Sequence, residues 1–88
     1  MSEQKHKKGH YIYYCWISSD GDESNTYIGT VLDYSNGVYL IGDKYGQGEY
    51  VKEEFVFNDI KDCMNYVKKV MNERREKLGK SKIWNDVK

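Results

Sequence analysis

The fold is decided at residues 11–17, Tyr-Ile-Tyr-Tyr-Cys-Trp-Ile, where an aromatic and β-branched run follows a polar start. Side chains of this kind suit the pleated surface of a sheet, so the run predicts a β-strand. Both alternating sets of side chains are apolar, and the strand is therefore expected to be central or covered on both faces. The polar cluster at residues 18–25 ends it.

Three further strands are expected after this one. A second covers roughly residues 26–33 and a third residues 38–41, and Asn36-Gly37 lies between them. Asn-Gly between two apolar runs is a strong hairpin signal, because a type I′ turn needs positive φ at both central residues. A glycine-rich turn at residues 43–48 then leads to a fourth strand over about residues 49–57. One face of this strand carries charged residues and is expected to face solvent, which indicates an edge strand.

The period of the apolar residues changes from two to 3.6 after this strand. Asn58 or Asp59 can cap a helix N-terminus, and Gly79 lies where a C-terminal glycine belongs. A helix is therefore expected from about Asp59 to Leu78. Its apolar stripe consists of Ile60, Cys63, Met64, Val67, Val70, Met71 and Leu78.

These elements predict an α+β fold in which a four-stranded antiparallel β-meander packs on one long C-terminal helix (ββββα), followed by a short tail. We expect a flexible basic arm over residues 1–9, a single domain over residues 10–79 and a basic tail over residues 80–88. One helix covers only part of such a sheet. The other face is expected to be solvated, curled or buried by a partner, and its aromatic surface predicts binding and a homodimer.

The charges of this 88-residue chain cancel, with 14 Lys and Arg against 14 Asp and Glu, but they are unevenly distributed. Residues 11–60 carry nine acids and two bases, whereas residues 61–88 carry nine bases and four acids. The zero total disfavours a strongly basic nucleic-acid binder and an acidic DNA mimic. The acidic middle predicts docking against a basic surface.

No arrangement of residues predicts catalysis or a cofactor. His6, His10 and Cys15 lack the spacing of a zinc site, and the acidic residues at 20–25 do not match a calcium loop. Both histidines fall near the expected arm, so no Ser-His-Asp arrangement is credible. The chain is therefore expected to be non-enzymatic, with no metal and no cofactor.

The composition also bears on location and origin. Cys15 and Cys63 lie far apart, and a small secreted domain usually carries four or more cysteines, so both are expected to be reduced thiols in a cytoplasmic protein. No run of about 18 apolar residues exists, which predicts no membrane span. The absence of Ala and Pro and the scarcity of Arg favour an AT-rich genome, such as that of a low-GC bacterium, its phage or another mobile element.

The leading hypothesis is a small non-enzymatic interaction protein. It would be a phage or mobile-element accessory protein with anti-defence action, which binds and modulates or inhibits a host protein. The expected partner-binding residues are an acidic loop and four tyrosines expected side by side across the sheet, since tyrosines are preferred anchors of protein interfaces. They are Asp20, Asp22, Glu23, Tyr13, Tyr27, Tyr39 and Tyr50.

Two alternatives remain open at this point. The first is a nucleic-acid-binding protein that uses the basic helix and tails to contact phosphates. Its candidate residues are Lys68, Lys69, Arg74, Arg75, Lys80 and Lys82. The second is a protein that binds a small ligand, such as a nucleotide, in an aromatic pocket.

Overall fold

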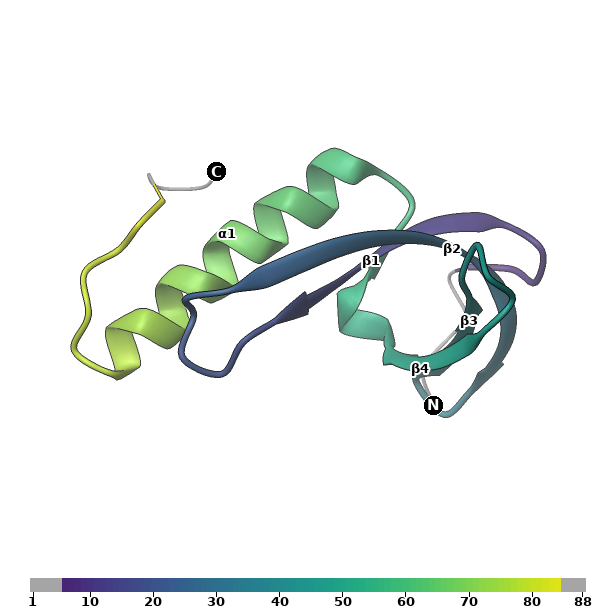
Figure 1. Ribbon diagram of the computed structural model, residues 1–88, viewed down its shortest axis with the longest axis horizontal. Helices are drawn as coiled ribbons and strands as arrows, with labels where there is room; N and C mark the ends of the chain where they lie inside the picture. The colour runs from purple at the N-terminus through teal and green to yellow at the C-terminus, as the bar shows by residue number, and fades with distance from the viewer. Residues whose placement is uncertain (1–5, 85–88) are drawn as a thin grey trace.

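The computed structural model describes residues 6–84 and shows a five-stranded antiparallel sheet packed against one C-terminal helix (Figure 1). In chain order the elements are β1 (Tyr11–Ile17), β2 (Ser24–Ser35), β3 (Val38–Gly42), β4 (Gly48–Lys52), the 3-10 helix η1 (Glu53–Phe55), β5 (Val56–Phe57) and α1 (Ile60–Lys77). The strand order in the sheet is β4-β3-β2-β1-β5. The predicted α+β class and the ββββα order are confirmed, with one extra strand.

The extra strand arises because η1 divides the predicted fourth strand. β4 pairs with β3 at one edge of the sheet, whereas β5 pairs with β1 at the opposite edge. In a flat sheet these outer strands would lie four strand spacings, about 19 Å, apart. A 3-10 turn of three residues spans only about 8 Å. The sheet must therefore curl, and of the three states expected for its second face the structure shows the curled one.

β2 bends to make this curl possible. Its first half, up to Thr30, pairs with β1, and its second half pairs with β3 (Figure 1). The register with β3 shifts between Val31 and Asp33, which leaves Leu32 as an extra residue. Such a bulge bends a strand and increases its twist. At the far end of β2, Asn36 and Gly37 have φ angles of 50° and 81°, as the predicted type I′ hairpin requires.

The curled sheet encloses one core and packs a second against α1. The concave face buries Ile12, Tyr14, Val31, Tyr39, Ile41, Val51 and Val56. The opposite face and the helix bury Cys15, Ile17, Cys63, Val67, Val70 and Met71. β1 therefore supplies Ile12 and Tyr14 to one core and Cys15 and Ile17 to the other. This confirms the expectation that both of its faces are covered.

α1 agrees with the predicted helix to within one residue at each end. The side chain of Asp59 accepts a hydrogen bond of 2.7 Å from the backbone N–H of Lys61, which caps the N-terminus. Leu78 is the C-cap, and Gly79 follows it with a φ of 75°. Among the described residues, no helix combines the length and the apolarity needed to cross a membrane.

The segments before and after the domain also contact it. His6 is buried, and its backbone N–H donates to the hydroxyl of Tyr39 at 3.0 Å. The amide side chain of Asn72 bonds the backbone of residues 83 and 84, which fixes Trp84 beside α1. Residues 6–9 of the predicted arm thus lie against the sheet. Residues 1–5 of the arm and residues 85–88 of the tail lie outside the described residues.

Gly21 links the β1–β2 loop to the helix and provides a test of this packing. Its φ is 76°, and an added Cβ would collide with the carbonyl oxygen of Met71. Gly46 has a similar φ of 79° with open space around it, so it is a matched control. We expect Gly46→Ala to cost about 1 kcal/mol and Gly21→Ala about 3 kcal/mol, measured by urea unfolding. Equal losses in the two variants would contradict the described contact.

Candidate binding groove

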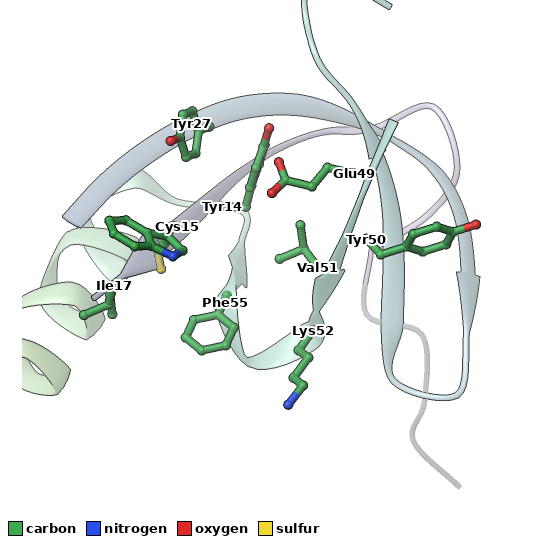
Figure 2. A pocket seen from close by; sticks show the side chains of 10 residues that line it. Tyr14, Cys15, Ile17, Tyr27, Glu49, Tyr50, Val51, Lys52 and Phe55 are labelled. Atoms are coloured by element: carbon green, nitrogen blue, oxygen red, sulfur yellow. The ribbon is translucent and has the colours of Figure 1, made fainter. Parts of the chain in front are cut away.

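A cavity of about 260 Å³ opens between β1 and β4, on the concave side of the sheet (Figure 2). Its walls are Tyr14, Cys15, Trp16, Ile17, Tyr27, Glu49, Tyr50, Val51, Lys52 and Phe55. We call this cavity the aromatic groove. A neighbouring hollow shares Tyr14, Tyr27 and Glu49 with it and extends to Asp43 in the β3–β4 turn.

The aromatic groove is the unfilled end of the concave face. Tyr14 lies opposite Tyr27 in the β1–β2 register, so both rings share a face, and they stack with ring centres 5.1 Å apart. Trp16 has the same parity as Tyr14 and is 49% exposed. β5 pairs with β1 only at Tyr13 and Tyr14, so it does not extend beside Trp16.

Glu49 brings a carboxylate to this apolar face. It lies opposite Ile41, which is fully buried in the concave core, so the two side chains share a face. Figure 2 shows the carboxylate of Glu49 near the hydroxyl of Tyr14. Burial, followed by the negative charges of Glu49 and Asp43, raises the pKa of Tyr14 above its ordinary value of 10.0. The groove is therefore electronegative as well as aromatic.

The lysines near the groove point elsewhere. Lys52 has the opposite parity to Val51, and Figure 2 shows its ammonium group pointing away from the groove. The ammonium of Lys44 lies 5.1 Å from the ring centre of Tyr45, with which it makes a cation–π contact. The carboxylate of Glu49 is thus the charge directed at the aromatic rings, an arrangement suited to binding a cation.

The four tyrosines predicted as binding residues do not share one face. Tyr27 lines the aromatic groove, and Tyr50 lies at its rim with 76% of its surface exposed. Tyr13 packs on the opposite face, toward α1, and Tyr39 is fully buried in the concave core. The expectation that they lie side by side is wrong, because the register places Tyr14 opposite Tyr27 and the curled sheet takes Tyr39 as core.

The predicted acidic loop is engaged within the chain. Asp20 accepts hydrogen bonds from its own loop, chiefly from a serine hydroxyl, and these lower the pKa of its carboxyl group. Asp22 pairs with Arg75 and with Lys80, so it ties the loop to the end of α1. Glu23 is exposed. None of the three acids lines the aromatic groove.

Most of the basic residues predicted to contact nucleic acid also have partners in the chain. The guanidinium group of Arg74 donates to two backbone carbonyls at the end of β1, at 2.7 and 3.1 Å. Arg75 and Lys80 pair with Asp22. The remaining three are Lys68, which lies over the Trp84 ring, Lys82, which pairs with Glu76, and the exposed Lys69. These contacts reduce the charge that remains for phosphates.

The two cysteines lie together in the core between β1 and α1. Both are free and buried. A hydrogen bond with Cys63, followed by burial, raises the pKa of the Cys15 thiol. A thiol held protonated is a poor nucleophile. In residues 6–84, no group of three or more His, Cys, Asp or Glu side chains is placed to hold a metal ion.

Sequence reasoning missed Tyr14, Trp16 and Glu49. A signal for Glu49 was available, because it shares the parity of Val51 and so places a charge on the apolar side of its strand. No such signal marked Tyr14 and Trp16, which follow the parity of the core residue Ile12. Tyr14 belongs to the core and also lines the groove, and only the incomplete closure of the sheet separates Trp16 from that core.

Comparisons with models of protein families, with curated proteins and with solved structures found no match for this chain. Its function is therefore inferred from the aromatic groove, the charges around it and the composition.

Two glutamate variants test whether Glu49 lies beside Tyr14. Glu49→Gln should lower the pKa of Tyr14 while leaving it above 10.0, because burial remains. The raised pKa means that the folded protein favours the neutral hydroxyl of Tyr14. The free energy of unfolding therefore falls as the pH rises from 10 to the pKa of Tyr14 in the folded state. This fall should be smaller in Glu49→Gln, because its Tyr14 pKa is closer to 10. The measurement is a tyrosine ring NMR titration combined with urea unfolding at several pH values.

Glu54→Gln is the matched control for this titration. The hydroxyl of Tyr66 donates to Glu54 at 3.2 Å, and burial together with this carboxylate raises the pKa of Tyr66 to about 12. The control should lower the pKa of Tyr66 and leave that of Tyr14 unchanged. If Glu49→Gln leaves the Tyr14 titration unchanged, the described geometry of the groove is contradicted.

Proposed function

We propose that this chain is a small non-enzymatic interaction protein that holds an arginine or lysine side chain of a partner protein in the aromatic groove. One observation carries the proposal: the carboxylate of Glu49 lies on the concave face with the rings of Tyr14, Trp16 and Tyr27. Aromatic faces and a carboxylate both attract positive charge, so together they select a cation. The composition supports the further proposal that the protein is a phage or mobile-element accessory protein whose partner is a host protein.

A basic side chain also fits the shape of the groove. The aliphatic stem of Arg or Lys packs on apolar surface such as that of Val51 and Phe55, while the charged head reaches the carboxylate. Glu49 is exposed, so its ion pair with a bound cation contributes up to about 1 kcal/mol, and a cation–π contact adds about 0.5–1 kcal/mol. These energies suffice for an anchor but not for a stable complex. The partner must therefore make contacts on both sides of the groove.

The same charges disfavour the two alternatives. A nucleotide would bring its phosphates toward Glu49 and Asp43, whose negative charges repel them. A nucleic acid would have to displace the internal ion pairs of Arg75 and Lys80. Both cysteines are buried, so neither offers an accessible nucleophile, which supports a non-enzymatic role.

Selection from a random heptapeptide display library tests the proposal. Peptides retained by the protein should be enriched in Arg or Lys at one position, because the groove takes one basic side chain. Glu49→Gln should weaken binding of the most enriched peptide about fivefold, which corresponds to the loss of one exposed ion pair of about 1 kcal/mol. Binding is measured by isothermal titration calorimetry.

Glu73→Gln provides the control, since Glu73 is exposed like Glu49 but lies on α1 and does not line the groove. It should leave the affinity within about twofold, because an exposed charge so far from the peptide is screened. Selected peptides without basic residues, no enrichment at all, or equal losses in the two variants would each contradict the proposed function.

A further inference from the structure

The aromatic groove runs along the edges of two strands. Side chains of a strand alternate between its faces, so a cavity on one face touches every second residue. The groove instead touches four consecutive residues of β4, from Glu49 to Lys52, and four consecutive residues of β1, from Tyr14 to Ile17. It therefore extends from the concave face into the space beside these strands, between the outer edge of β4 and the edge of β1.

Both edges lack a neighbouring strand there. β4 is the last strand in the sheet order and pairs with β3 alone within the described residues. β1 has β5 on its outer side only at Tyr13 and Tyr14, so its last three residues extend past that partner. The groove thus occupies the place where a further strand could extend the sheet from β4, whereas on the β1 side the carbonyl of Ile17 already accepts a hydrogen bond from Arg74.

The hydrogen bonds at the ends of the β3–β4 ladder show which backbone groups face this space. The N–H of Asp43 donates to Gln47, and the N–H of Glu53 donates to Gly37, both at 2.9 Å. Hydrogen-bonded and non-hydrogen-bonded pairs alternate along an antiparallel ladder, so the odd-numbered residues of β4 bond to β3. The residues that direct their N–H and C=O groups to the free edge are Gly48, Tyr50 and Lys52.

We propose that an extended basic segment of a partner protein binds as an added β-strand on the free edge of β4, with one Arg or Lys side chain in the aromatic groove. This inference rests on the proposed function and adds the backbone hydrogen bonds through which the partner segment is held beside the groove. Strand addition gives affinity through main-chain hydrogen bonds and specificity through alternate side chains. Cross-strand neighbours lie about 5 Å apart, so a basic residue opposite Glu49 or Val51 reaches the carboxylate.

The edge itself suits this occupant better than a second copy of the chain. β4 is a regular five-residue strand without a bulge, and Tyr50 on it is 76% exposed. Edges of this kind pair readily with other strands. A second β4 would bring a second Glu49 to the same edge, where like charges repel, whereas a basic segment brings the opposite charge.

Backbone methylation of the peptide tests the strand directly on the native protein. The heptapeptide most enriched in the display selection is synthesised with an N-methyl group at each position in turn. Methylation at alternate positions should weaken binding about tenfold, because each removes a backbone hydrogen bond, and methylation at the positions between them should have little effect. Equal effects at all positions would overturn strand addition.

A pair of substitutions at Tyr50 tests the protein side of the same contact. Tyr50→Pro removes an N–H that faces the free edge and spares the bonds to β3, whereas Tyr50→Ala removes the ring and keeps the N–H. We expect Tyr50→Pro to weaken peptide binding about tenfold more than Tyr50→Ala. Circular dichroism verifies the fold, and if Tyr50→Pro does not fold, the methylated peptides decide.

The two levels of the inference fail in different ways. If replacing the peptide's basic residue by Gln has no effect, the proposed function is wrong. If that replacement weakens binding but alternate N-methylation and Tyr50→Pro do not, the cation site stands and strand addition is wrong. If light scattering shows a dimer of the chain that Tyr50→Pro abolishes, the occupant of the edge is a second copy, and the proposed segment is excluded.

Discussion

The short connection formed by η1 is the constraint on which the rest of the structure depends. It joins strands that lie on opposite sides of the sheet, so the sheet has to curl, and the bulge in β2 supplies the bend. Because the sheet curls, β1 contributes side chains to two cores, one on the concave face and one against α1. A chain with few aliphatic residues thereby buries apolar surface on both faces of β1, one of which a flat sheet with one helix would leave exposed.

The aromatic groove follows from the same constraint, because the closure is incomplete. β5 has only two residues and pairs with Tyr13 and Tyr14, so the last three residues of β1 have no strand on their outer side. Aliphatic side chains and the buried ring of Tyr39 fill the rest of the concave face. At the open end the sequence supplies rings and the carboxylate of Glu49, so the surface there is aromatic and negative. A site of this kind arises where a sheet stops short of a barrel and its outer backbone groups have no strand partner.

The uneven charge of the chain has two roles in the fold. Some of the charged side chains have partners within the chain. Asp22 of the acidic loop pairs with Arg75 and Lys80, and Arg74 donates to the backbone at the end of β1. These contacts tie the basic helix to the acidic sheet and leave less of either charge for partners. The acids near the groove, Glu49 and Asp43, take no part in this network. The charges of this network therefore do not neutralise the acids near the groove.

The sequence by itself determined the elements whose signals are local. The period of apolar residues, Asp59 and Gly79 define the helix, the Asn36-Gly37 pair defines the hairpin, and the apolar character of both sets of side chains in β1 predicts two covered faces. Only the tertiary structure decided the groove, because it depends on which strand edges meet. Tyr14, Tyr27 and Glu49 come from three strands, and their approach is set by register and curl, which local periodicity does not encode.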